Sequence, residues 1–333
     1  MLTIAVDAMG GDHAPQSEVE GAVRAAKTLG VKVILVGQED VVRRELATHH
    51  GSGDLPIEIV NARERITMED SAARAVRAKR DSSMRVASRL VRDGVAQGFV
   101  SAGNTGAVMA ASTLILRLHT AVTRAAIGAM LPTAREPLLL LDAGANVDCD
   151  AKELVGFAHL GAVYARDVLG RAEPSVGLLN IGEEDEKGNA VVKEAHQLLK
   201  TQNGFRYAGN VEGRDVPAGE ARGQPLDVVV CDGFTGNIVL KFYESAGKVF
   251  VAYIKKDAPD ILQRPDMQRV LEVFDWATYG GAPLLGVQGV SIICHGSSTA
   301  KAIKNAIRVA VQAVESHLDQ DIEAELSRSQ VTV

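Results

Sequence analysis

Short apolar runs alternate with helix-like segments along most of this chain. The runs at 2–8, 32–37, 57–62, 98–102, 125–131, 137–143, 175–182, 205–211, 226–232 and 290–296 predict strands. Several are continuous leucine or β-branched runs, which is typical of parallel strands covered on both faces. Amphipathic spacing at 17–30, 153–170 and 190–201 predicts helices between them. This alternation predicts an α/β fold, a three-layer α/β/α sandwich with a mostly parallel sheet.

One segment departs from this pattern. No repeat, linker or low-complexity stretch divides residues 1–333, so we expect a single domain. Residues 245–288 are too long for an ordinary crossover and carry amphipathic apolar positions interrupted by prolines, which predicts a protruding helical excursion. Its apolar face is explained either by a homodimer contact or by contact with a membrane surface. The candidate membrane residues are Val251, Ile254, Lys255 and Lys256.

Six predicted strands end in short loops rich in Gly, Asn, Asp, Ser, Thr and His. Ligands of open α/β sheets bind outside the carboxyl ends of the parallel strands, where such loops converge. We therefore expect one active-site rim. Its candidate phosphate-binding or substrate-binding residues are Asp7, Gly10, Gly11, His13, Gly103, Asn104, Thr105, Gly106, Asp142, Asn146, His295, Ser297 and Ser298.

Three of these loops carry candidate groups for a small anionic substrate. Residues 101–107 precede a predicted helix, so their backbone amides suit an anion, although a plain helix cap explains the same residues. Asn237, at another strand-to-helix turn, is placed to polarise a carbonyl oxygen or to cap the helix. Lys187 is the cation of the acidic loop 183–189, and a solvated lysine is its simpler explanation. The usual dinucleotide, P-loop, esterase and zincin motifs do not occur.

Composition narrows the classes of partner. A net charge of −6 and only 4% aromatic residues argue against a nucleic-acid binder. The basic positions Arg74, Arg77, Arg85, Arg89 and Arg92 have near-helical spacing, which favours an acidic macromolecular partner over the alternative of a solvated face.

The cysteines and the start of the chain indicate a cytoplasmic protein. Cys149, Cys231 and Cys294 fit no disulfide framework and no zinc site, so we expect buried thiols rather than a covalent nucleophile. We expect no metal and no organic cofactor. No signal peptide and no membrane-spanning run is predicted.

The order of the loop motifs resembles one known family. The segments AVDAMGGDHAP, KRDSSMRVASRLVRDG, VSAGNTGAVMA, LLDAGANVDC, NIGEEDEKGN, DGFTGN, YGGAPLLGV and HGSSTAKAI are together similar to the bacterial phosphate acyltransferase family (PlsX), over roughly residues 1–310. The resemblance implies transfer of a fatty acyl group from acyl-acyl-carrier protein to inorganic phosphate. The acyl phosphate would supply a membrane glycerol-3-phosphate acyltransferase in phospholipid synthesis.

The resemblance also implies structural and catalytic properties. It implies a homodimer with an isocitrate-dehydrogenase-like fold, peripheral membrane association, and Lys187 and Asn237 as the catalytic positions. Phosphate oxygen can attack a thioester directly, because a thiolate with a pKa near 8.5 leaves readily. The alternatives are a phosphate acetyltransferase that uses acetyl-CoA and a non-catalytic, membrane-docked adaptor of lipid enzymes.

Overall fold

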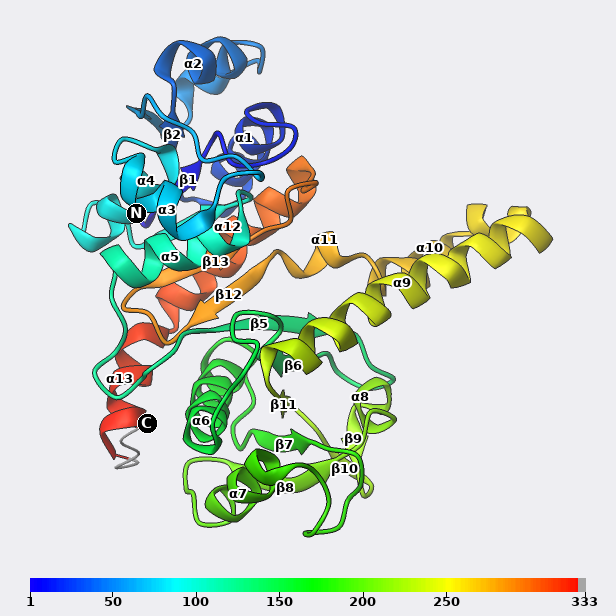
Figure 1. The fold of residues 1–333 in the computed structure, drawn as a ribbon. Coiled ribbons are helices and arrows are strands. Elements are labelled where there is room, and N and C mark those ends of the chain that lie inside the picture. The colour runs from blue at the N-terminus through cyan, green and yellow to red at the C-terminus, as the bar shows by residue number, and fades with distance from the viewer. Residues whose placement is uncertain (329–333) are drawn as a thin grey trace. The chain divides into compact units, whose positions relative to one another are not determined.

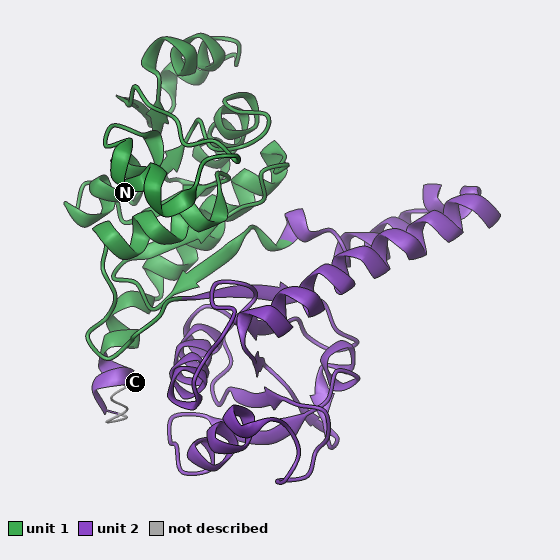
Figure 2. Cartoon of the chain, in the orientation of Figure 1, with its two compact units in different colours: residues 1–125, 279–323 green, residues 126–278, 324–333 purple. Residues whose placement is uncertain are grey.

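The computed structural model describes residues 1–328 and divides the chain into two compact units. Unit 1 comprises residues 1–125 and 279–323, and unit 2 comprises residues 126–278 and 324–333 (Figure 2). Each unit contains its own set of neighbouring strands flanked by helices (Figure 1). The six loops predicted to form one rim are thereby distributed equally, three to each unit.

Unit 1 contains strands in the order β3-β2-β1-β4-β13-β12, all parallel except β12, which is antiparallel to β13. The strands are β1 Thr3–Asp7, β2 Lys32–Gly37, β3 Ile57–Asn61, β4 Gly98–Ser101, β12 Ala282–Leu285 and β13 Val290–Ile293. The helices are α1 Gln16–Leu29, α2 Glu39–Ala47, η1 Ser52–Asp54, α3 Ala72–Ala78, α4 Ser83–Arg92, α5 Thr105–Ile115 and α12 Ala300–Glu315. α1 packs against α12, and α5 packs against α3 and α4.

Unit 2 contains strands in the order β5-β6-β11-β7-β8, parallel except for the antiparallel pair β5–β6. The strands are β5 Ala126–Leu131, β6 Leu138–Leu141, β11 Val228–Val230, β7 Ser175–Leu179 and β8 Arg206–Val211. A short hairpin, β9 Glu220–Ala221 with β10 Gln224–Pro225, follows α8 Asp215–Ala218. α6 Ala151–Asp167 packs on α7 Ala190–Leu199 and on β6, β7 and β11, whereas α9 Gly233–Asp257 contacts β5 and β6.

The apolar runs form the core, as their pattern predicts. Leu138, Leu139, Leu140 and Leu141 are all completely buried, so both faces of β6 are covered. A strand in this position has no solvent face, which explains a continuous leucine run in place of alternation. The mostly parallel α/β architecture predicted from the sequence is confirmed.

The segment 245–288 continues a helix that begins earlier. α9 runs for 25 residues from Gly233, and η2 Pro259–Gln263, α10 Pro265–Val273 and α11 Trp276–Tyr279 follow it before β12 (Figure 1). Along α9 only Gly233 and Gly236 are buried. Phe250 and Tyr253 are exposed, whereas Val251 and Ile254 are half-buried. Within residues 1–328, no helix has both the length and the hydropathy needed to cross a membrane.

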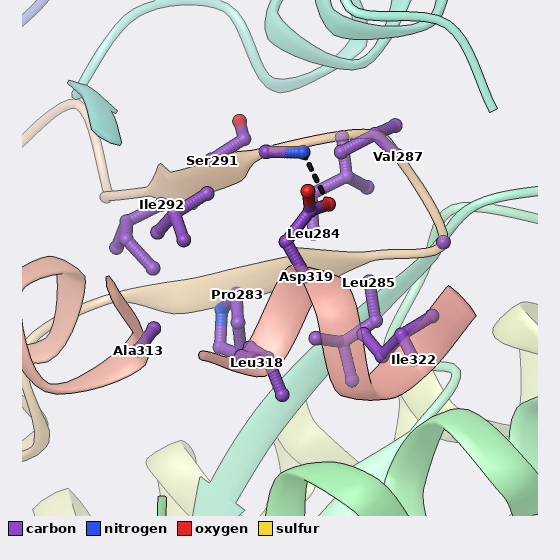
Figure 3. Close-up of a pocket in the computed structure, with 13 residues that line it drawn as sticks. Pro283, Leu284, Leu285, Val287, Ser291, Ile292, Ala313, Leu318, Asp319 and Ile322 are labelled. Atoms are coloured by element: carbon purple, nitrogen blue, oxygen red, sulfur yellow. Dashed lines mark hydrogen bonds between the residues drawn. The ribbon is translucent and has the colours of Figure 1, made fainter. Parts of the chain in front are cut away.

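The β12–β13 hairpin of unit 1 is fixed to α13 Leu318–Arg328. Asp319 accepts a hydrogen bond from the Gly289 amide at 2.5 Å (Figure 3). The Asp319 carboxylate also lies 3.1 Å from Nε2 of buried His119. Apolar side chains such as Leu284 and Ile322 enclose a cavity of only about 10 Å³ beside this contact. That volume is at the lower limit for one water molecule, so the hairpin and helix are closely packed.

Candidate functional site

Asp7, at the end of β1, organises the first of two loop clusters. We call loops 7–13, 101–107 and 295–299 the unit 1 loop cluster. Ser101 donates a hydrogen bond from Oγ to Asp7 Oδ2 at 2.8 Å and accepts one from the Gly103 amide at 3.1 Å. A Cβ at Gly10 would lie 2.7 Å from that same amide nitrogen, so the loops need glycine at this close approach. The predicted binding residues Asp7, Gly10 and Gly103 are thus brought together, but as buried packing partners.

Glu18 and Arg65, which the sequence analysis did not select, hold the Gly11 peptide from both sides. The Gly11 amide donates to Glu18 Oε1 at 3.2 Å, and Arg65 Nη2 donates to the Gly11 carbonyl at 3.1 Å. Glu18 is 1% exposed, and burial raises its pKa to about 7. A glutamate in an amphipathic helix and an arginine in a loop carry no motif, so only the packing identifies this pair.

The predicted anion cradle at 101–107 has a structural role at Asn104. Its Oδ1 accepts a hydrogen bond from the Ala107 amide as the cap of α5, and its Nδ2 donates to the carbonyl of Met68. The simpler interpretation, a helix cap, therefore describes this side chain. Thr105 and Gly106 are exposed at the helix start and remain accessible to an anion.

The third loop of the unit 1 loop cluster joins the first through the backbone. The Asp12 amide donates to the Gly296 carbonyl at 2.8 Å. His13, His295 and Ser297 are exposed, whereas Ser298 is 1% exposed, with its amide donating to the His295 carbonyl.

Asp142, after β6, organises the second cluster. We call loops 142–149, 180–189 and 232–237 the unit 2 loop cluster. The Asp142 carboxylate accepts hydrogen bonds from the amides of Ile127, Gly144, Ala145 and Asn146 and from the Asn146 side chain, at 2.7–3.1 Å. Burial raises its pKa, and these N–H donors oppose that rise. Asp142 and Asn146 therefore shape the loop from inside and are both buried.

The start of α9 places Asn237 against this loop. Asp232 caps the helix by accepting from the Thr235 amide at 2.8 Å. A Cβ at Gly236 would overlap the carbonyl oxygen of Asp142, so the helix approaches as closely as glycine permits. The exposed Asn237 lies beside Gly144, because a Cβ added to Gly144 would be in van der Waals contact with the Asn237 Cβ at 3.4 Å. The φ of 137° at Gly144 is the feature that favours glycine there.

Lys187 lies in the loop after β7, among acids that are paired elsewhere. Asp185 binds His196 and Lys200, and Glu183 binds Arg214 and Arg222. Within residues 1–328 no carboxylate pairs with the exposed Lys187 ammonium. Its alkyl chain packs near Gly182, and its carbonyl accepts from Asn180 Nδ2 at 3.1 Å. An exposed cation without a carboxylate partner is suited to an anionic substrate.

Three segments of the unit 2 loop cluster border one cavity of about 520 Å³. Its walls come from Val147–Cys149, from the start of α7 and from the start of α9. Sequence pattern alone did not reveal it, because its lining residues are ordinary caps and apolar positions.

The thiols are poor nucleophiles. Burial raises the pKa of Cys149, which lines the cavity, to about 12, and the Asp142 and Glu153 carboxylates add to the rise. Burial also raises the pKa of Cys294 to about 12 and that of Cys231 well above its ordinary value. All three cysteines are free. Among residues 1–328, no three His, Cys, Asp or Glu side chains are grouped as metal ligands.

The predicted basic stripe is divided between two helices. Arg74 and Arg77 are exposed on α3, and the chain turns at Lys79–Ser82 before α4. Arg85 donates to the Val76 carbonyl and Arg89 to the Arg80 carbonyl, while Arg92 pairs with Asp93. The near-helical spacing of these five arginines therefore spans two helices, α3 and α4, instead of one continuous helix. Arg74 and Arg77 are the exposed arginines of the set that have no such contact.

The fold is similar to that of solved phosphotransacylases. A phosphotransacetylase from Streptococcus pyogenes matches with a TM-score of 0.63 and 21% identity, covering 94% of each chain. A branched-chain phosphotransacylase from Enterococcus faecalis matches with a TM-score of 0.59 and 16% identity, covering 94% of this chain and 99% of that one. At these identities the likeness establishes the fold.

Sequence relatives then establish the family. The family model described as "Fatty acid synthesis protein" matches residues 2–320. The phosphate acyltransferase of Trichlorobacter lovleyi is 47% identical, with 98% of this chain and 95% of the relative covered. That of Geobacter sp. is 50% identical, with 93% and 88% covered. The chain belongs to this phosphate acyltransferase family and is an acyltransferase.

Proposed function

We propose that this acyltransferase transfers a fatty acyl group from acyl-acyl-carrier protein to inorganic phosphate, with acyl phosphate as the product for phospholipid synthesis. The relatives' name, phosphate acyltransferase, supports phosphate as the acceptor. The observation that carries the proposal is the unit 2 loop cluster. Its loops carry an exposed amide, Asn237, and an exposed cation, Lys187, and the same loops contribute residues to a ligand-sized cavity. Burial raises the pKa of the cavity's thiol, Cys149, to about 12, so it is a poor nucleophile.

The chemistry follows from these groups. A phosphate oxygen attacks the thioester carbonyl carbon, and the carbonyl π electrons move to oxygen. Collapse of this tetrahedral intermediate breaks the C–S bond and releases the thiolate, whose pKa of about 8.5 makes it a good leaving group. In this proposal Lys187 attracts the phosphate, and the Asn237 amide donates to the developing oxyanion. No side chain forms a covalent bond to the acyl group.

Carrier-protein recognition is assigned to the exposed part of the basic stripe. Acyl carrier proteins are acidic, and Arg74 and Arg77 present exposed guanidinium groups on α3. Complementary charge of this kind accelerates encounter and weakens with salt. Arg85 and Arg89 are proposed to support this surface through their contacts with the backbone.

The α9–α10 segment is proposed to serve a homodimer contact, peripheral membrane contact, or both. Exposed Phe250 and Tyr253 lie near Lys255 and Lys256 in sequence, and this combination of apolar and cationic side chains suits an anionic lipid surface. We propose that the protein is cytoplasmic and binds the membrane peripherally through this segment. There it would supply acyl phosphate to a membrane glycerol-3-phosphate acyltransferase. Phe250→Asp and Tyr253→Asp test this more directly than Val251→Asp or Ile254→Asp, because the latter pair is half-buried. Vesicle sedimentation and oligomeric mass, measured on the same variants, separate the two roles.

The proposed reaction is tested by incubating the protein with phosphate and either palmitoyl-carrier protein or acetyl-CoA. We expect palmitoyl phosphate and free carrier-protein thiol in equal amounts. Acetyl phosphate from acetyl-CoA, with no product from the carrier protein, would establish the acetyltransferase alternative. No acyl phosphate from either donor would contradict the proposed reaction.

A further inference from the structure

The 520 Å³ cavity of unit 2 has the size of a ligand site. It lies where the loop after β6, the start of α7 and the start of α9 meet, which is the carboxyl-end position expected for ligands of parallel sheets. Ligand pockets span about 300–1,000 Å³. Its volume and its position therefore both point to a bound ligand.

The lining is partly apolar and partly acidic. Val147 and Phe234 are 64% and 60% exposed, which is high for large apolar side chains, and half-buried Val191 adds to this surface. Asp148 and Asp232 also line the cavity. The N-termini of α6 and α9 are capped by the negatively charged Asp150 and Asp232, whereas that of α7 is capped by the neutral Asn189. The residues that line the cavity include two carboxylates and no cationic side chain. Phosphate groups are thus disfavoured in this cavity.

A purely hydrocarbon ligand is disfavoured as well. It would remove water from the two carboxylates without giving them a hydrogen-bond donor, which is costly. Asn189 uses Oδ1 to accept from the Val192 amide at 2.9 Å, so its NH₂ group is the part that can reach a ligand carbonyl. The lining suits a neutral chain that combines apolar groups with amide or hydroxyl donors and amide carbonyls.

We infer that this cavity binds the pantetheine arm of the acyl donor. Pantetheine carries methyl groups, two amides and hydroxyl groups, and it is the thiol-bearing arm common to acyl carrier protein and CoA. This inference rests on the proposed function, since that reaction requires a thioester donor. The lining includes residues that are two positions from each proposed catalytic group. Asn189 follows Lys187 by two residues, and Thr235, another lining residue, precedes Asn237 by two.

The test fills the cavity and compares three donors. Val191→Trp places a bulky side chain in the cavity, and Gln197→Trp places the same side chain on the exposed face of the same helix, α7. KM is measured with palmitoyl-carrier protein, palmitoyl-CoA and palmitoyl-pantetheine. We expect Val191→Trp to raise KM at least tenfold for all three donors, with KM for phosphate and Tm unchanged, and Gln197→Trp to behave as the unsubstituted protein.

Other outcomes overturn the inference. An unchanged KM for palmitoyl-pantetheine would exclude the arm from this cavity. A change limited to palmitoyl-carrier protein would assign the surface to protein docking, and one limited to palmitoyl-CoA would assign it to the nucleotide. If Val191→Trp does not fold, Val147→Trp, which lies in an exposed loop, replaces it as the variant that fills the cavity. If the unsubstituted protein makes no acyl phosphate, the proposed function fails. Titration of the unsubstituted protein and of the Val147→Trp variant with free pantetheine then decides whether the cavity binds the arm.

Discussion

The two loop clusters are organised by the same kind of residue but differ in which polar side chains they expose. In each, an aspartate that follows a buried strand gathers neighbouring loops, Asp7 in unit 1 and Asp142 in unit 2, and glycines allow the loops to touch. In unit 1 the interior also contains Glu18 and Arg65, which fix Gly11. In unit 2 the buried polar residues of the cluster are Asp142 and Asn146, whereas Asn237 and Lys187 are exposed. The comparison teaches that a strand-end aspartate shapes its loop from inside, whereas the proposed catalytic residues of unit 2 are exposed on the surface of the cluster.

The largest effect is expected where the unit 2 loops touch. Gly236→Ala would force a Cβ into the Asp142 carbonyl oxygen, whereas the Cβ of Gly10→Ala would stand 2.7 Å from Asp7 Oδ2 and the Gly103 amide. Overpacking costs about 1–3 kcal/mol and occasionally more, so we expect more than about 3 kcal/mol for Gly236→Ala and a value within that range for Gly10→Ala. Thermal and urea unfolding measure both. Equal and small losses of unfolding free energy in the two variants would contradict this prediction, because they would show that the structure relaxes around both added Cβ atoms.

The exposed groups of unit 2 should affect turnover without affecting folding. Lys187→Ala and Asn237→Ala should each remove about 2–4 kcal/mol of transition-state stabilisation, the size of one oxyanion or charge contact. Lys193→Ala on exposed α7 is the matched control for charge. Acyl phosphate formation is measured under saturating donor and phosphate. Normal turnover in folded variants would remove these residues from the chemistry.

The buried acid of unit 1 should make stability depend on pH. The pKa of Glu18 is raised from 4.5 to about 7 in the folded protein, where Asp7 repels its charge and Arg65 favours it. The folded state therefore holds this proton more tightly than the unfolded state, so stability falls as pH rises from about 4.5 to about 7. Glu18→Gln should match the unsubstituted protein near pH 4.5 and exceed it by about 2–3 kcal/mol at pH 8. A pH-independent difference in unfolding free energy would contradict this.

Charge reversal in unit 1 should produce a smaller effect that depends on the donor. Arg74→Glu with Arg77→Glu should raise KM for palmitoyl-carrier protein about tenfold at low salt, because both side chains are exposed and rim charges act mainly on association. KM for palmitoyl-pantetheine should not change. Equal changes for both donors would indicate a structural role for α3.

Sequence pattern predicted the strands and loops because they are local. Apolar runs define β1, β6 and β11, and the polar residues that follow them mark the clusters. The hydrogen bonds of Glu18 and Arg65 to the Gly11 peptide were not predictable, because they join residues far apart in sequence that carry no motif. The turn at Lys79–Ser82 was missed because it contains no Gly or Pro. Lys79, at the start of the turn, pairs with Asp70. β12 was missed because it is short and follows a proline-interrupted segment.

The central claim is that phosphate attacks the donor thioester directly, so that no cysteine acts as a covalent nucleophile. Replacement of Cys149, Cys231 or Cys294 by Ala should change turnover less than about tenfold, since phosphate is the proposed nucleophile. The most direct measurement is the mass of the enzyme, quenched with acid within one turnover of palmitoyl-carrier protein and phosphate. We predict palmitoyl phosphate and enzyme of unchanged mass at every time point. A palmitoyl adduct on the enzyme that forms and decays at the rate of turnover would contradict the account.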